Sequence, residues 1–284
     1  SCFSERSGVV NIGIEGMMTI GAFVGSVVAY YTGNGWFGFF CGGLAGAAFG
    51  VLYAVACVSF GADQTISGTA VNFIAPGLAI FLCKAMFDNS SDSPALETAS
   101  KLPKMFNGIF PAGSFGYNVL STYSAAYLSF LLVMVIWFVF YKTRFGMRLR
   151  AVGEHPKACE TLGINVFRIR YICVILSGFL AGLGGALQVS IYASAMPDMQ
   201  YGGEMDVIAA CVIGGVSMSG GRGTVVGALL GSLILATIAK ALPLVGIGAL
   251  WQNTIKGVLI LVVVVVNVVL QRIADRNALK GREM

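Results

Sequence analysis

Charged residues are scarce in this chain of 284 residues. Asp, Glu, Lys and Arg together make up 11% of it, and apolar residues make up 57%. A soluble domain carries about 25% charged residues, so most of the surface of this protein must face lipid. The net charge is +5, but the basic residues gather at 142–170 and at the C-terminus, a distribution typical of membrane flanks and not of a nucleic-acid partner.

The chain also lacks the residues of common metal and catalytic sites. It has one histidine, His155, and none of its seven cysteines forms a C-x-x-C pair, which favours small buried thiols over metal ligands or disulfides. No G-x-x-x-x-G-K-[ST] motif is present, so the chain cannot cradle ATP phosphates in a P-loop. Paired catalytic groups for hydrolysis inside a membrane are absent as well. We therefore expect no catalytic residue, no metal and no cofactor.

Long apolar runs are what the sequence does contain. A spanning helix needs about 20 apolar residues, and the runs predict an all-α polytopic membrane protein with about eight to nine transmembrane helices. The candidate spans are 9–30, 37–59, 65–87, 123–141, 171–191, 204–218, 224–240 and 251–271. The run 204–218 is short and lies between two Gly-Gly pairs, so we expect a broken or partial helix there.

Residues 142–170 form the one long, strongly basic polar segment between apolar runs. The positive-inside rule places this segment in the cytoplasm, and we expect a short helix at 156–162 that docks on a soluble partner. With this segment inside, both termini fall inside and 88–122 falls outside. The external segment is either a capping loop or a landing surface for an external partner.

A possible internal repeat links the two halves of the chain. Gly46-x-x-x-Gly50 precedes the sequence QTISG at 64–68, and Gly227-x-x-x-Gly231 precedes QNTIKG at 252–257. In the topology above the two copies run in opposite directions, as in the inverted repeats of many transporters, where the pathway lies at the repeat interface. Chance similarity is the competing explanation, because the match is short.

Polar residues inside apolar spans are costly and often mark function. Asn11 and Glu15 are four residues apart, which predicts that they share one helix face. Asn72 and Phe73 precede Pro76, where we expect the helix to open. We predict that Asn11, Glu15, Asn72 and Phe73 face a polar passage, where an amide could hydrogen-bond a solute and an aromatic ring could stack on a base. The alternative for each polar group is an interhelical hydrogen bond, and Glu15 could also relay protons.

Three segments resemble motifs of the permeases of branched-chain amino acid and simple-sugar ABC importers. They are SERSGVVNIGIEGMM at 4–18, AVGEHPKACETLGI at 151–164, and IGG at 213–215 followed by SGGRGT at 219–224. The N-terminal phrase and DQTISGTAVN at 63–72 look most like bacterial nucleoside importer permeases. The family usually has a further helix before its N-terminal motif, so we expect an upstream segment that this chain lacks.

The resemblance implies a permease of the type II ABC importer kind in a bacterial cell membrane, with no enzymatic activity of its own. It implies a nucleoside as cargo and, as partners, a second homologous permease, a cytoplasmic ATP-binding subunit and an external substrate-binding lipoprotein. A simple-sugar permease and a proton-coupled secondary transporter using Glu15 are the alternatives. The residues expected to couple to the ATPase are Glu154, His155, Pro156, Lys157, Ala158, Glu160, Thr161, Leu162 and Gly163.

Overall fold

The computed structural model describes residues 1–87, 92–97, 100–103, 124–217, 220–221 and 223–246, with scattered positions between 251 and 265. Within these residues the regular secondary structure is helical and includes no strand. The elements are α1 (Cys2–Arg6), α2 (Ile14–Thr32), α3 (Gly35–Ala54), η1 (Val55–Ser59, a π-helical turn), α4 (Gln64–Met86), α6 (Ser124–Lys142), α7 (Arg144–Glu154), α8 (Pro156–Thr161), α9 (Val166–Tyr192), α10 (Gly203–Ile213) and α11 (Val225–Leu244).

Five of the described helices are long and apolar enough to cross a membrane, and a sixth span results if α6 and α7, bent by 74° at their junction, are counted as one. The all-α, multi-pass architecture predicted from the sequence is therefore confirmed. The expected number of about eight to nine spans is not confirmed, and most of the candidate 251–271 lies outside the described residues. The short span was predicted correctly, because α10 has only 11 residues.

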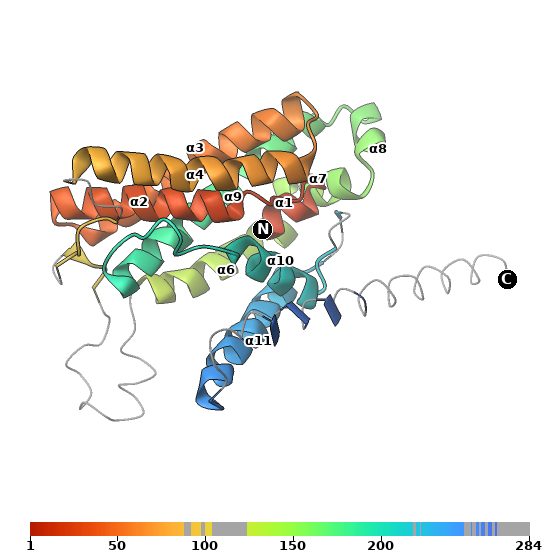
Figure 1. Ribbon diagram of the computed structural model, residues 1–284. Coiled ribbons are helices and arrows are strands. Elements are labelled where there is room, and N and C mark those ends of the chain that lie inside the picture. Colours follow the sequence, from red (N-terminus) through yellow and green to blue (C-terminus); the bar gives the residue numbers. More distant parts are fainter. Residues whose placement is uncertain are drawn as a thin grey trace.

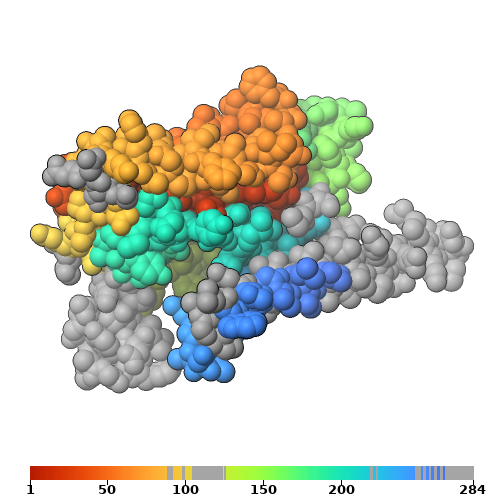
Figure 2. Space-filling view, in the orientation of Figure 1, coloured from red at the N-terminus to blue at the C-terminus, as the bar shows by residue number. Residues whose placement is uncertain are grey.

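Four helices, α2, α3, α4 and α9, run side by side and form the main bundle (Figure 1). The contact between α2 and α9 is so close that a Cβ added to Gly21 would lie 2.4 Å from the Cα of Gly182. Small residues of this kind let helix backbones approach in a membrane, where interhelical packing replaces the hydrophobic effect. In the space-filling view, α4 forms a long outer side of the molecule (Figure 2).

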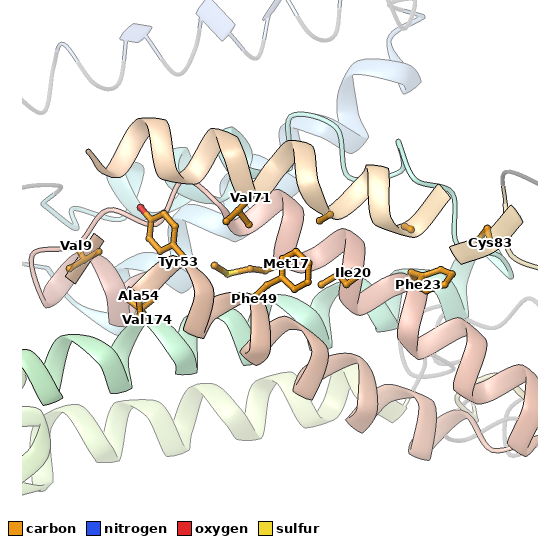
Figure 3. Close-up of a cluster of buried hydrophobic side chains, with 12 residues drawn as sticks. Val9, Met17, Ile20, Phe23, Phe49, Tyr53, Ala54, Val71, Cys83 and Val174 are labelled. Carbon is orange, nitrogen blue, oxygen red and sulfur yellow. The ribbon is translucent and has the colours of Figure 1, made fainter. Parts of the chain in front are cut away.

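The core of this bundle is a cluster of apolar side chains from α2, α3, α4 and α9 (Figure 3). Met17 and Tyr53 are completely buried in it. The hydroxyl group of Tyr53 donates a 2.6 Å hydrogen bond to the backbone oxygen of Val10, so the polar end of this ring also holds the chain that leads into α2. A buried tyrosine needs such a partner.

The bundle has two distinct ends. At one of them, here called the α8 end, α7 contacts both α1 and α8 (Figure 1). Arg6 there bonds to the loop that contains Gly221. At the opposite end, here called the Asn34 end, the turn between α2 and α3 lies near 92–97, which pairs with 193–195 through the Leu96 N–H to Ala193 oxygen bond of 2.7 Å. The described residues 92–97 of the predicted external segment and the predicted cytoplasmic segment 142–170 therefore lie at opposite ends of the bundle.

Two local predictions were wrong. The N-terminal span does not begin at Val9, because α2 starts only at Ile14 and Gly13 is its N-cap. The helix that contains Pro76 does not open there, because α4 continues through it to Met86. Sequence reasoning also missed α7 and gave 142–170 as a loop with one short helix, although α7 packs the buried side chains of Leu149 and Val152 into the core.

Candidate translocation path and docking helix

Asn11 lies in the non-helical stretch between α1 and α2 and is fully buried. Its amide nitrogen donates a 3.1 Å hydrogen bond to the hydroxyl oxygen of Ser177 on α9. Because Asn11 precedes the first residue of α2, it does not share a helix face with Glu15 as the four-residue spacing predicted. In this chain Asn11 holds the non-helical stretch against α9.

Asn72 also contacts this stretch, from the side of α4. Its amide nitrogen donates to the backbone oxygen of Ile12 at 3.0 Å, and its amide oxygen accepts from the N–H of Gly16 at 2.8 Å. The two bonds satisfy backbone groups on both sides of the start of α2, which an irregular stretch inside a membrane requires. The neighbouring Phe73 points away from the bundle and is 76% exposed, so the structure does not bring its ring to Asn72.

Glu15 lies in the first turn of α2, and its carboxylate accepts a 2.9 Å hydrogen bond from the N–H of Gly202. Gly202 is the N-cap of α10, and Glu204 follows in the first turn of that helix. The carboxyl group of Glu204 interacts with that of Glu15. From this meeting point α2 runs to the Asn34 end and α10 runs towards the α8 end, so two acid-bearing helices start together and diverge.

The segment between α9 and α10 adds more polar groups to the same region. The buried side-chain amide of Gln200 donates to the side-chain oxygen of Gln188 on α9. Gln188 also lines a cavity of about 440 Å³ between α9, α10 and α11, together with Asp206 and Ser232. The rest of the lining is apolar and includes Leu235 and Ala236, which lie on the same helix as Ser232.

Such a cavity can hold a small polar solute. Its volume lies within the range of small-molecule sites, about 300–1,000 Å³. Three helices each contribute a polar side chain to it, and these groups can hydrogen-bond a solute while the apolar lining residues pack against a ring. Polar groups inside a membrane protein generally mark substrate or ion pathways. We refer to Glu15, Gln188, Gln200, Glu204, Asp206 and Ser232 as the central polar layer.

The short helix expected at 156–162 is present as α8, which ends at Thr161. Cys159 is buried and anchors this helix in the same apolar cluster as Leu149 and Val166. The other coupling candidates are less buried: Pro156 is half-buried, and Glu154, His155, Lys157, Ala158, Glu160, Thr161, Leu162 and Gly163 are exposed. Leu162 is 79% exposed. The helix and its C-cap residue therefore offer polar side chains and the apolar side chains of Ala158 and Leu162 outward from the α8 end.

Gln200 and Ser232 of the central polar layer were missed from the sequence, as was Gly202, which binds Glu15. Gln200 and Gly202 lie between spans and looked like loop residues, and a serine in an apolar run carries little signal alone. The one available indication was the pair of acids, Glu204 and Asp206, directly after Gly202-Gly203. The external segment is only partly described, and its described residue Ser93 is buried and bonds to the hydroxyl group of Ser26 at 2.7 Å.

Comparisons with known proteins agree with this geometry. The family model described as the permease component of branched-chain amino acid transport systems matches residues 2–264. The guanosine ABC transporter permease protein NupQ of Bacillus subtilis is 36% identical over 253 residues, which cover 86% of this chain and 76% of NupQ. The nucleoside ABC transporter permease protein NupC of Lactococcus lactis is 38% identical over 242 residues, covering 82% of this chain and 73% of NupC.

A third relative is named for a different cargo. The putative glucose ABC transporter permease protein TsgC13 of Haloferax volcanii is 35% identical over 200 residues, which cover 70% of this chain and 60% of TsgC13. No solved structure matches the chain.

Proposed function

The chain belongs to the permease family of branched-chain amino acid transport systems and is a permease subunit of an ABC importer, and we propose that its cargo is a nucleoside. The observation that carries this proposal is the similarity to two permeases named for guanosine and for nucleosides. Both matches cover more of this chain than the match to the glucose permease does. A simple sugar is the second candidate.

ABC permeases work with an ATP-binding subunit and a substrate-binding protein. We propose that α8 receives the ATP-binding subunit, through the exposed side chains of Glu154, Lys157, Glu160 and Leu162. The α8 end and the N-terminus would then face the cytoplasm, in agreement with the basic residues at 142–170. The Asn34 end would face the substrate-binding lipoprotein that delivers the cargo from outside.

The mechanism proposed is alternating access, with a second, homologous permease completing the pathway. Glu15 and the rest of the central polar layer would line this pathway, and the cavity beside Asp206 would hold the cargo briefly between the two sides. Phe73, because it points outward, would border the pathway where the partner permease lies. Asn11 and Asn72 would act indirectly, because they hold the non-helical stretch before α2 and so position Glu15.

The proposal is tested by transport in proteoliposomes. The chain would be purified with its candidate permease partner, the ATP-binding subunit and the substrate-binding protein, and uptake of radiolabelled guanosine measured with and without ATP. Competition by unlabelled nucleosides and no competition by glucose or galactose is the expected result. Competition by sugars but not by nucleosides would identify a simple sugar as the cargo. Uptake driven by a proton gradient without the ATP-binding subunit would favour a secondary transporter instead.

A further inference from the structure

Arg6 is nearly buried at the α8 end and joins two parts of the chain. Its Nη2 atom donates a 2.9 Å hydrogen bond to the backbone oxygen of Gly221, and the N–H of Gly221 donates back to the backbone oxygen of Arg6 at 3.3 Å. The guanidinium carbon lies 5.6 Å from the centre of the Phe140 ring on α6. Three separate segments therefore meet around one arginine.

The end of α7 fits into the same place without any side chain between the backbones. A Cβ added to Gly153 would lie 1.9 Å from the backbone oxygen of Arg6, and one added to Gly220 would lie 2.7 Å from the oxygen of Gly153. Gly220 has φ +92°, a left-handed conformation that glycine adopts at little cost. We call the contact of Arg6, Gly153, Gly220 and Gly221 the Arg6 junction.

The Arg6 junction connects the docking helix α8 to the stretch that leads into α2 and to the loop that follows α10. Gly153 is followed by Glu154, the last residue of α7, and α8 begins at Pro156. Arg6 leads through a non-helical stretch into α2 and Glu15, and Gly221 lies in the loop between α10 and α11. Because the contacts join backbone to backbone, α7 cannot shift without moving one or both of these segments.

The guanidinium group also has unused hydrogen-bonding capacity. Among the described residues, its Nε and Nη1 atoms are buried without a hydrogen-bond partner. An arginine has five N–H donors in a fixed fork, so Arg6 can take up new acceptors when the surrounding backbone moves. A contact that transmits a conformational change must have two stable arrangements, and the free N–H donors of Arg6 allow a second one.

We propose that Arg6 is the positioning residue through which movement of α7 and α8 reaches the central polar layer. The proposal rests on the proposed function, because it assumes that α8 receives the ATP-binding subunit. Movement at α8 passes through Gly153 to Arg6 and Gly221. From there it changes how α2 and α10 meet at Glu15 and Gly202, which opens or closes the pathway.

The test is the number of guanosine molecules taken up per ATP hydrolysed in proteoliposomes that contain the complete importer. We expect Arg6→Met to leave co-purification with the ATP-binding subunit and ATP hydrolysis in place and to lower uptake per ATP about ten-fold, the loss expected for one charge-assisted hydrogen bond. Arg6→Lys should restore part of the coupling. The matched control is Arg148→Met, at an exposed arginine on α7, which should behave as the wild type.

Two results would overturn the proposal. One is a parallel fall in uptake and ATP hydrolysis, which would make Arg6 a purely structural residue, and the other is uptake and ATP hydrolysis that both stay at the wild-type rates. Where Arg6→Met does not assemble, Arg6→Lys, which nearly keeps the volume of the side chain, and Phe140→Leu, which removes the ring beside the guanidinium group, carry the same measurement. Failure of the wild-type complex to bind the ATP-binding subunit or to take up guanosine would instead contradict the proposed function.

Discussion

The carboxylate of Glu15 accepts a 2.9 Å hydrogen bond from the N–H of Gly202, and this contact ties the start of α2 to the start of α10. Gly202 has φ +74°, which favours glycine and turns the chain into α10. Two helices that run to opposite ends of the molecule thus begin at one hydrogen bond. An inverted repeat predicts such an arrangement, although the second copy of its motif lies partly outside the described residues.

Two variants of Glu15 distinguish the role of its negative charge from the role of its hydrogen bond to Gly202. Glu15→Ala removes the acceptor for Gly202 and should lower guanosine uptake about ten-fold, as expected for a lost charge-assisted bond. Glu15→Gln keeps an acceptor oxygen, and its amide can donate to the buried Oε2 of Glu204, which has no partner among the described residues. Glu15→Gln should therefore keep most of the uptake. Equal loss in both variants would show that the charge itself is required.

Asn72→Leu should destabilise the protein without a direct effect on the cargo. It removes the hydrogen bonds to Ile12 and Gly16, at a cost of about 1–3 kcal/mol. The measurement is the thermal midpoint in detergent, compared with Thr69→Val on the same helix, whose hydroxyl group only bonds within α4. A normal midpoint with lost uptake would instead place Asn72 in the pathway.

Two adjacent glycines on α9 give a matched pair for helix packing. A Cβ at Gly185 would lie 2.0 Å from the backbone oxygen of Met18, whereas one at Gly184 would meet only the Met18 methyl carbon at 3.8 Å. Gly185→Ala should therefore lower stability by about 1–3 kcal/mol. Gly184→Ala should be neutral or raise stability by up to about 1 kcal/mol. Thermal unfolding of the two purified variants decides this, and equal midpoints would contradict the packing described.

Changes at the end of α8 should abolish coupling while the protein still inserts. The N–H of Gly163 donates to the backbone oxygen of Glu160 at 3.0 Å, and Gly163 has φ +77°. Gly163→Pro loses the donor and cannot adopt this φ, and Glu160→Arg reverses an exposed charge. Both should lose uptake and stimulated ATP hydrolysis, with Glu160→Gln as the milder control. Normal stimulation of ATP hydrolysis in Gly163→Pro would show that α8 is not part of the docking surface.

Labelling of single cysteines tests the orientation. In a variant without the native cysteines, a cysteine in place of the exposed Glu97 should react with an impermeant thiol reagent added outside intact cells. A cysteine in place of the exposed Lys157 should react only after the cells are opened. Ser90 offers a second external position that the sequence predicts. Reversed labelling would show that the topology is inverted and that α8 does not face the cytoplasm.

The sequence alone was enough to predict the all-α, multi-pass architecture, the short helical segment at α10 and the short helix after His155. These features depend on local composition. A run of apolar residues is stable only in lipid or in a core, Gly-Gly pairs interrupt a helix, and a proline at its first position starts one.

Which polar groups meet was decided only by the tertiary structure. Helical spacing placed Asn11 beside Glu15, but the buried contact with Ser177 keeps Asn11 outside α2. Glu15 finds its partner 187 residues away, and Arg6 finds Gly221 at a separation of 215. Periodicity reports which face of a helix is buried and carries no information about the helix that covers it. The partner is selected by close packing and by the need of each buried polar group for a hydrogen bond, and both depend on the whole fold.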